Sequence, residues 1–130
     1  MKIAFLGDIA IVGKYDLTKE NHALSRLDVL AEELKKHDFV IANLESPFTE
    51  KTSSIIPKSI HLRTSPRNID ILKHLNIKAV SLANNHTYDF GNKGLTDTIN
   101  FLDKNGIEWF GANGKSLIKN INGEKISVSG

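Results

Sequence analysis

Short apolar runs alternate along the chain with segments whose apolar residues recur at helical spacing. Runs of about four to eight apolar residues, rich in β-branched and aromatic side chains, are typical of buried strands. An alternation of strands and helices predicts βα units around a parallel sheet, and therefore the α/β class. The strands are expected at 2–6, 38–42, 77–83 and 107–110, and the helices at 21–36, from Ser65-Pro66 onward and at 94–105.

The tail of the chain carries a different pattern, with alternating runs on either side of Asn122-Gly123. Asn-Gly between two such runs is a strong signal for a two-residue hairpin turn, because both residues tolerate positive φ. A mostly parallel sheet followed by a C-terminal β-hairpin is therefore expected. No linker or internal repeat divides the chain, so we expect residues 1–130 to form a single domain.

The composition narrows the classes of function. A formal charge of +2 with scattered lysines and arginines offers no basic stripe, so no binding to nucleic acid is expected. Because cysteine is absent, a disulfide, a zinc–thiolate site and a thiol nucleophile are excluded. The apolar N-terminus is interrupted by Asp8, unlike a signal peptide or a membrane span. We therefore expect a cytoplasmic protein without a membrane segment.

Polar side chains follow three neighbouring strands at the point where each strand ends. Asp8 follows the first strand, Asn43 and Glu45 the second, and Asn85 and His86 the third. Ligands of parallel α/β sheets bind outside the carboxyl ends of the strands, where these side chains would converge. Carboxylates, an amide oxygen and an imidazole suit Mg, Mn, Fe or Zn. A divalent cation would also relieve the repulsion between neighbouring carboxylates.

Each of these residues also has a plain structural reading. Asp8 could cap the following segment, and Glu45 could be a solvated loop residue. Asn84 and Asn85 could occupy turn conformations, and His86 could be a hydrogen-bonded turn histidine. The joint occurrence of all of them at one predicted sheet edge favours a site over a set of unrelated turns.

Five segments together resemble the bacterial capsule-synthesis family (CapA-like, poly-γ-glutamate capsule), within the calcineurin-like metallophosphoesterases. The segments are Gly7-Asp8, Asn43-Leu44-Glu45-Ser46-Pro47, Ser81-Leu82-Ala83-Asn84-Asn85-His86-Thr87-Tyr88-Asp89-Phe90-Gly91, Gly94-Leu95 and Gly111-Ala112. The resemblance extends over essentially the whole chain, and the segment around Asn85 is its most specific part. It implies an α/β/β/α sandwich with a two-metal site holding Mn, Fe, Zn or Mg.

The same resemblance implies roles for the residues at the strand ends. Asp8 would ligate one metal, and Glu45 would take the place of the bridging carboxylate. Asn85 would ligate the second metal through its amide oxygen, and Asn43 would line the pocket. His86 would approach the scissile group as an acid or a transition-state stabiliser, since histidine suits proton delivery near neutral pH.

Two further residues have alternative readings. Asp89 either orients His86 or caps the following helix, and the cap is the favoured reading. Arg63, with Arg67 nearby, either recognises a phosphate or carboxylate of the substrate or is simply solvated.

Two departures from the family pattern bear on activity. Many metallophosphoesterases carry Asp-x-His after the first strand, but the third position here is Ala10, which leaves that metal one ligand short. The family's later histidine motifs lie in a second half of the fold. The chain therefore resembles the N-terminal part of a metallophosphoesterase-like domain, for which we expect weak metal binding and poor or absent hydrolysis.

These considerations leave two hypotheses about function. The first is a phosphoesterase-type hydrolase of capsule or poly-γ-glutamate biosynthesis, with a phosphorylated or polyanionic cell-surface polymer as substrate. The alternative is a non-catalytic accessory or binding protein that retains the fold. Self-association or a C-terminal half could supply the remaining histidines, because a free sheet edge invites pairing.

Overall fold

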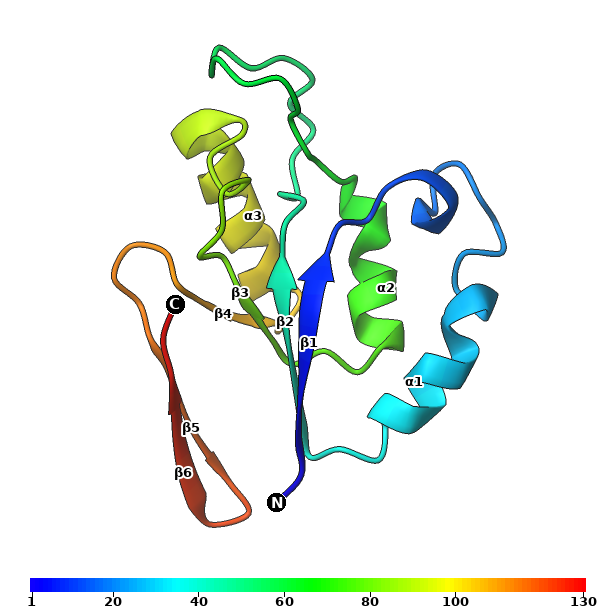
Figure 1. The fold of residues 1–130 in the computed structure, drawn as a ribbon, viewed down its shortest axis with the longest axis vertical. Helices are drawn as coiled ribbons and strands as arrows, with labels where there is room; N and C mark the ends of the chain where they lie inside the picture. Colours follow the sequence, from blue (N-terminus) through cyan, green and yellow to red (C-terminus); the bar gives the residue numbers. More distant parts are fainter.

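A four-stranded parallel sheet forms the centre of the computed structural model, which describes residues 1–130 (Figure 1). The strands follow one another in the order β1-β2-β3-β4, and each pairs with the next in the parallel sense. They are β1 (Ile3–Ile9), β2 (Phe39–Leu44), β3 (Ala79–Ser81) and β4 (Glu108–Phe110). The predicted α/β class with a mostly parallel sheet is confirmed.

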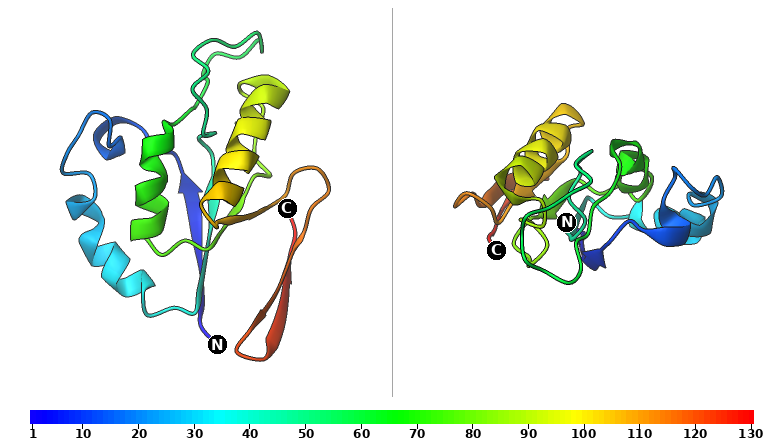
Figure 2. Two further views of the ribbon diagram at one scale, coloured as in Figure 1. Left: turned by 180° about the vertical axis from the view of Figure 1, so that it is seen from behind. Right: turned by 90° about the horizontal axis from the view of Figure 1, so that it is seen from above.

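The helices connect the strands and lie largely on one side of the sheet (Figure 2). Helices α2 and α3 cover that face, whereas α1 lies beyond the edge formed by β1 (Figures 1 and 2). The helices are α1 (Asp28–Leu34), α2 (Ile69–His74) and α3 (Gly91–Lys104), with short 3₁₀ turns η1 (Gly13–Tyr15), η2 (Ser25–Leu27) and η3 (Pro66–Asn68). None of these helices has the length and apolar character needed to cross a bilayer.

The first helix is shorter than its periodicity predicts, because residues 21–24 form turns. A Glu20 side-chain oxygen accepts a hydrogen bond from the His22 backbone N–H at 3.2 Å, and the Ser25 hydroxyl donates to the His22 carbonyl at 2.9 Å. Such local side-chain bonds compete with the helical pattern. The third helix differs in the other direction, since it begins at Gly91 rather than at residue 94.

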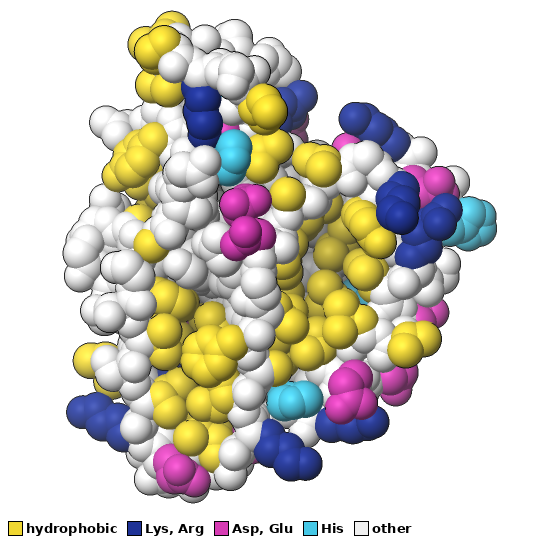
Figure 3. Space-filling view, viewed as in Figure 1, with side chains coloured by type: hydrophobic (Ala, Val, Ile, Leu, Met, Phe, Trp, Pro, Cys, Tyr) yellow, Lys and Arg dark blue, Asp and Glu magenta, His cyan; other side chains and the backbone are white.

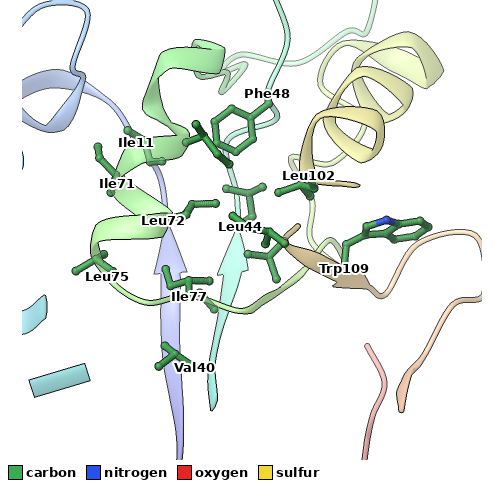
Figure 4. Close-up of a cluster of buried hydrophobic side chains, with 14 of the residues drawn as sticks. Ile11, Val40, Leu44, Phe48, Ile71, Leu72, Leu75, Ile77, Leu102 and Trp109 are labelled. Carbon is green, nitrogen blue, oxygen red and sulfur yellow. The ribbon is translucent and has the colours of Figure 1, made fainter. Parts of the chain in front are cut away.

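The main core lies between the sheet and helices α2 and α3. Val40, Ala42 and Leu44 alternate along β2 and point to this side, as the two-residue period of a strand requires. Leu72 of α2 and Leu102 of α3, both without exposed surface, converge on them (Figure 4). This packing fixes the positions of the carboxyl ends of the central strands.

The opposite face of the sheet carries the hairpin of β5 (Leu117–Ile121) and β6 (Glu124–Val128). Phe39 and Ile41 of β2 form a second apolar cluster that includes Leu117 of β5. The turn between β5 and β6 has φ of 52° at Asn122 and 85° at Gly123. The predicted hairpin is therefore confirmed, together with its turn.

Strand β1 is an edge strand, since β2 is its only neighbour in the sheet. Phe5 pairs in register with Ile41 and therefore shares the face that carries the hairpin, but it is 65% exposed. Figure 3 shows hydrophobic side chains at the surface between the sheet and the hairpin. The part of this sheet face around Phe5 is therefore exposed to solvent and is not covered by the hairpin.

Candidate functional site

The parallel register brings the ends of three strands to one edge of the sheet. Asp8 of β1 lies opposite Asn43 of β2, which lies opposite Ser81 of β3. The Asn43 amide donates a hydrogen bond from Nδ2 to Asp8 Oδ1 at 2.8 Å. Acidic side chains and a histidine gather in this region, above the carboxyl ends of β1 and β2 (Figure 3). The expected convergence of Asp8 and Asn43 is confirmed.

Asn84 connects this edge to the turn that follows β3. Its Nδ2 donates to Asn43 Oδ1 at 3.1 Å and to the Leu44 carbonyl at 2.9 Å. Its Oδ1 accepts from the His86 backbone N–H at 2.9 Å and from the Thr87 hydroxyl at 3.2 Å. A side-chain amide has both donors and acceptors, so one residue fastens β2 to the turn that presents His86. The sequence predicts only a turn at Asn84, and the doubled asparagine is its one sign of a further role.

Replacing Asn84 with alanine is expected to lower the free energy of unfolding by about 2–3 kcal/mol, because its partners lose their bonds in a partly buried region. The neighbouring Asn85→Ala variant is the matched control, since the Asn85 side chain is exposed and makes no hydrogen bond. Urea denaturation followed by circular dichroism measures both. Equal midpoints for the two variants would contradict the role assigned to Asn84.

His86 and Asp89 form a hydrogen-bonded pair in the same turn. His86 Nδ1 lies 2.7 Å from Asp89 Oδ2, and the Leu62 backbone N–H donates to the same oxygen at 2.6 Å. Phe90 occupies the N-cap position of α3, and no side chain caps that helix. The favoured reading of Asp89 as a helix cap is therefore wrong. Its carboxylate faces His86, which is the alternative that the sequence left open.

Asp89 is held as a buried carboxylate, with 1% of its surface exposed. Burial by itself raises the pKa of Asp89, but hydrogen bonds from Lys58, His86 and the Leu62 backbone hold it below its ordinary value. Asp89 therefore stays ionised at neutral pH. Because an ionised carboxylate only accepts hydrogen bonds, His86 Nδ1 carries the proton of this contact and leaves Nε2 free.

Lys58 belongs to this site although the sequence does not predict it. Its Nζ donates to Asp89 Oδ1 at 2.7 Å and to the Asn85 carbonyl at 2.8 Å. Nζ also lies 3.1 Å from His86 Nδ1, but a nitrogen that donates to Asp89 has no lone pair left for Lys58. Lys58 comes from the long loop between β2 and α2, and nothing in the loop sequence distinguishes it from Lys51. It fastens that loop to the His86 turn.

Three candidates lie outside this hydrogen-bonded network. The Glu45 side chain is partly exposed and makes no hydrogen bond, although its backbone N–H donates to the Ile9 carbonyl at 3.0 Å. The Asn85 side chain is exposed, and only its backbone carbonyl joins the network, through Lys58. Arg63 is also exposed. The structure thus joins Asp8, Asn43, His86 and Asp89 and leaves Glu45, Asn85 and Arg63 outside.

The oxygen atoms at this edge fit a metal site only in part. Asp8 Oδ2, the Glu45 carboxylate and the Asn85 amide oxygen are free of hydrogen bonds and have the hard character that Mg or Mn prefers. No three side chains of Asp, Glu, His or Cys gather to hold a metal ion. These oxygens would supply at most part of the ligand set that a two-metal centre requires.

Comparison with known proteins identifies the family of the chain. The family model described as "Bacterial capsule synthesis protein PGA_cap" matches residues 2–130. The chain belongs to this family. The resemblance stated from the five sequence segments is thereby confirmed.

Two curated relatives from Bacillus are named for the biosynthesis of PGA and of capsule, respectively. The "PGA biosynthesis protein CapA" of Bacillus subtilis is 32% identical over 133 residues, which cover 98% of this chain and 34% of that protein. The "Capsule biosynthesis protein CapA" of Bacillus anthracis is 30% identical over 106 residues, which cover 75% of this chain and 26% of that protein. The chain therefore spans about a third or less of the length of these members of the capsule synthesis family.

A third relative is a mycobacterial protein. The "Probable polyglutamine synthesis accessory protein" of Mycobacterium tuberculosis is 39% identical over 75 residues, which cover 58% of this chain and 20% of that protein. All three relatives are named for synthesis or biosynthesis, and none of the names states a reaction.

Proposed function

We propose that residues 1–130 contribute part of a metal-dependent, phosphoesterase-type hydrolytic site in a protein of capsule or poly-γ-glutamate biosynthesis. The observation that carries this proposal is the chain of hydrogen bonds from Asp8 through Asn43, Asn84 and His86 to Asp89. A free carboxylate oxygen stands at one end of that chain, and a histidine with a free ring nitrogen stands near the other. This pairing of a cation ligand with a group that can exchange a proton suits the hydrolysis of a phosphoester.

Each residue of the network would have a separate part in this chemistry. A divalent cation, when bound, would supply Lewis-acid activation of water and neutralise charge on a phosphoryl oxygen. Asp8 would hold the cation, with Glu45 and Asn85 as further oxygen donors. Asn43 orients the Asp8 carboxylate through its hydrogen bond. His86 would exchange a proton with the leaving group through Nε2.

A non-catalytic accessory role is the second candidate, and two observations favour it. No three acidic or histidine side chains lie close enough together to hold a metal ion, and Ala10 stands where many metallophosphoesterases have a ligating histidine. The mycobacterial relative is itself named an accessory protein. In that role the same edge would bind polymer or a partner without cleaving a bond.

The Asp8→Asn variant tests the metal-dependent function. Manganese binding, followed by electron paramagnetic resonance, is expected to weaken at least tenfold, because the charged ligand is lost while the shape is kept. Manganese-dependent hydrolysis of bis(p-nitrophenyl) phosphate is expected to fall by about two orders of magnitude. The control is Asp70→Asn, since Asp70 is exposed on α2 and makes no hydrogen bond.

The outcomes separate the two candidate functions. Manganese binding that depends on Asp8, without measurable hydrolysis, would favour the accessory role. Unchanged binding and hydrolysis in Asp8→Asn would refute the site itself.

A further inference from the structure

A polar cavity of about 270 Å³ lies beside the candidate site. It is bounded by the segment that follows β1 and by the segment 61–65, and its charged lining side chains are Asp16, Lys19 and Arg63. One water takes up about 30 Å³ of the liquid, so the cavity has room for a group of the size of a phosphate or a carboxymethyl group. We call it the Arg63 cavity.

The Arg63 cavity carries an excess of positive charge. The Asp16 carboxylate is already engaged, because it accepts hydrogen bonds from the Thr18 backbone N–H at 3.0 Å, the Thr18 hydroxyl at 2.7 Å and Asn68 Nδ2 at 3.0 Å. Lys19 lies 3.7 Å from the same carboxylate. Arg63 makes neither an ion pair nor a hydrogen bond through its guanidinium. Two cations and one carboxylate leave one net positive charge, and it lies on Arg63.

The backbone on both sides of Arg63 is fixed. The preceding residue, Leu62, donates its N–H to Asp89 at 2.6 Å. The backbone N–H of the following residue, Thr64, donates to the Pro47 carbonyl at 2.9 Å. The guanidinium therefore extends from an anchored segment, which reduces the ordering cost of binding a ligand.

The same contacts connect the Arg63 cavity to the candidate site. The Asp89 carboxylate bonds both to the Leu62 backbone N–H and to His86. Arg63 therefore directly follows a residue that is bonded to the His86–Asp89 pair. On the opposite wall, the Ile11 N–H donates at 3.0 Å to the hydroxyl of Ser46, which directly follows Glu45. The cavity thus adjoins the site along both of its bounding segments.

We propose that the Arg63 cavity is a subsite that binds one oxyanion group, a carboxylate or a phosphate, of the molecule held at the Asp8–His86 edge. A free guanidinium matches both oxyanions through two parallel N–H···O bonds. The proposal rests on the proposed function only for the identity of that molecule. Binding of an anion in the cavity requires neither a metal nor hydrolysis.

The test compares two arginines of the same chain. The γ-linked glutamate trimer and inorganic phosphate are titrated separately, in the presence of a chelator, and binding is measured by calorimetry. Arg63→Gln is expected to weaken binding of at least one of the two probes tenfold or more. Arg67→Gln is the control, because Arg67 is also exposed and lies outside the cavity, and its replacement removes the same charge. It is expected to change the affinity less than twofold.

Each outcome bears on the proposal. Dependence on Arg63 for the glutamate trimer identifies a carboxylate subsite, and dependence for phosphate identifies a phosphate subsite. Equal weakening in both variants, or no binding of either probe, overturns the subsite. Because hydrolysis does not enter the measurement, loss of the subsite leaves the Asp8 test untouched, and failure of the Asp8 test leaves the subsite standing.

Discussion

The Asp89→Asn variant is expected to lose about 3 kcal/mol of unfolding free energy at pH 7, because it removes one partner of a buried ion pair. Asp89 is 1% exposed and accepts hydrogen bonds from Lys58, His86 and the Leu62 backbone. An asparagine has the same shape, but it lacks the charge that balances Lys58. The side-chain NH₂ group of an asparagine would also face N–H donors that now bind the Asp89 oxygens. Urea denaturation followed by circular dichroism measures the loss.

The loss should depend on pH in a defined direction. The pKa of Asp89 lies below its ordinary value of 3.8 in the folded protein, because the hydrogen bonds to its charged form outweigh the effect of burial. A group of this kind stabilises the fold above its unfolded pKa and ceases to do so as the pH falls through its folded pKa. The difference between wild type and Asp89→Asn should therefore be full at neutral pH and shrink below about pH 4.

An exposed carboxylate on α2 provides the control for the effect of pH. Asp70→Asn replaces an exposed carboxylate without hydrogen bonds and should change the stability little at either pH. A difference for Asp89→Asn that stays constant between neutral and acid pH would contradict a stabilising contribution from the charge of Asp89.

The fold was predictable where local patterns determine it. Apolar runs located the strands and helical spacing located the helices. Asn122-Gly123 marked a turn that requires positive φ at both residues. The convergence of Asp8 and Asn43 followed from parallel pairing alone, because neighbouring parallel strands end at the same edge. The strands, helices and turn depend on residues that are close in sequence, and the convergence at the edge depends on the parallel pairing of the strands.

The contacts that orient His86 were not predictable in the same way. Lys58 and Asp89 are 31 residues apart, and the loop that carries Lys58 has no periodicity that would fix its path. Asp89 before a helix is a common capping arrangement, so local statistics favoured the cap. Asp89 does not cap the helix, because the backbone N–H of Leu62, which tertiary packing brings close, donates to the same Asp89 oxygen that faces His86.

One consequence is that the long loop between β2 and α2 forms a wall of the candidate site. Lys58 and Leu62 bind the Asp89 carboxylate, and the Ser54 hydroxyl donates to the Asp89 carbonyl at 2.5 Å. Three points of attachment to one buried residue couple the loop to the orientation of His86. Release of the loop and loss of the His86 orientation are therefore expected to occur together when Asp89 is changed.

The His86→Ala variant is expected to lower the rate of manganese-dependent phosphodiester hydrolysis by about 10²–10⁴-fold, the usual contribution of a general acid or base. Asp89 holds Nδ1, so the free Nε2 is the ring nitrogen that can exchange a proton with a leaving group. Manganese affinity, measured in parallel, is expected to change less than twofold, because the oxygens of Asp8, Glu45 and Asn85 remain.

The exposed His22, whose side chain makes no hydrogen bond, provides the control His22→Ala, which should leave rate and affinity unchanged. A parallel loss of affinity and rate in His86→Ala would instead assign His86 to the ligand set. An unchanged rate would remove it from the chemistry. The ratio of the two effects thus separates proton transfer from metal binding at a single residue, and Asp8→Asn, which should lower both, supplies the opposite pattern.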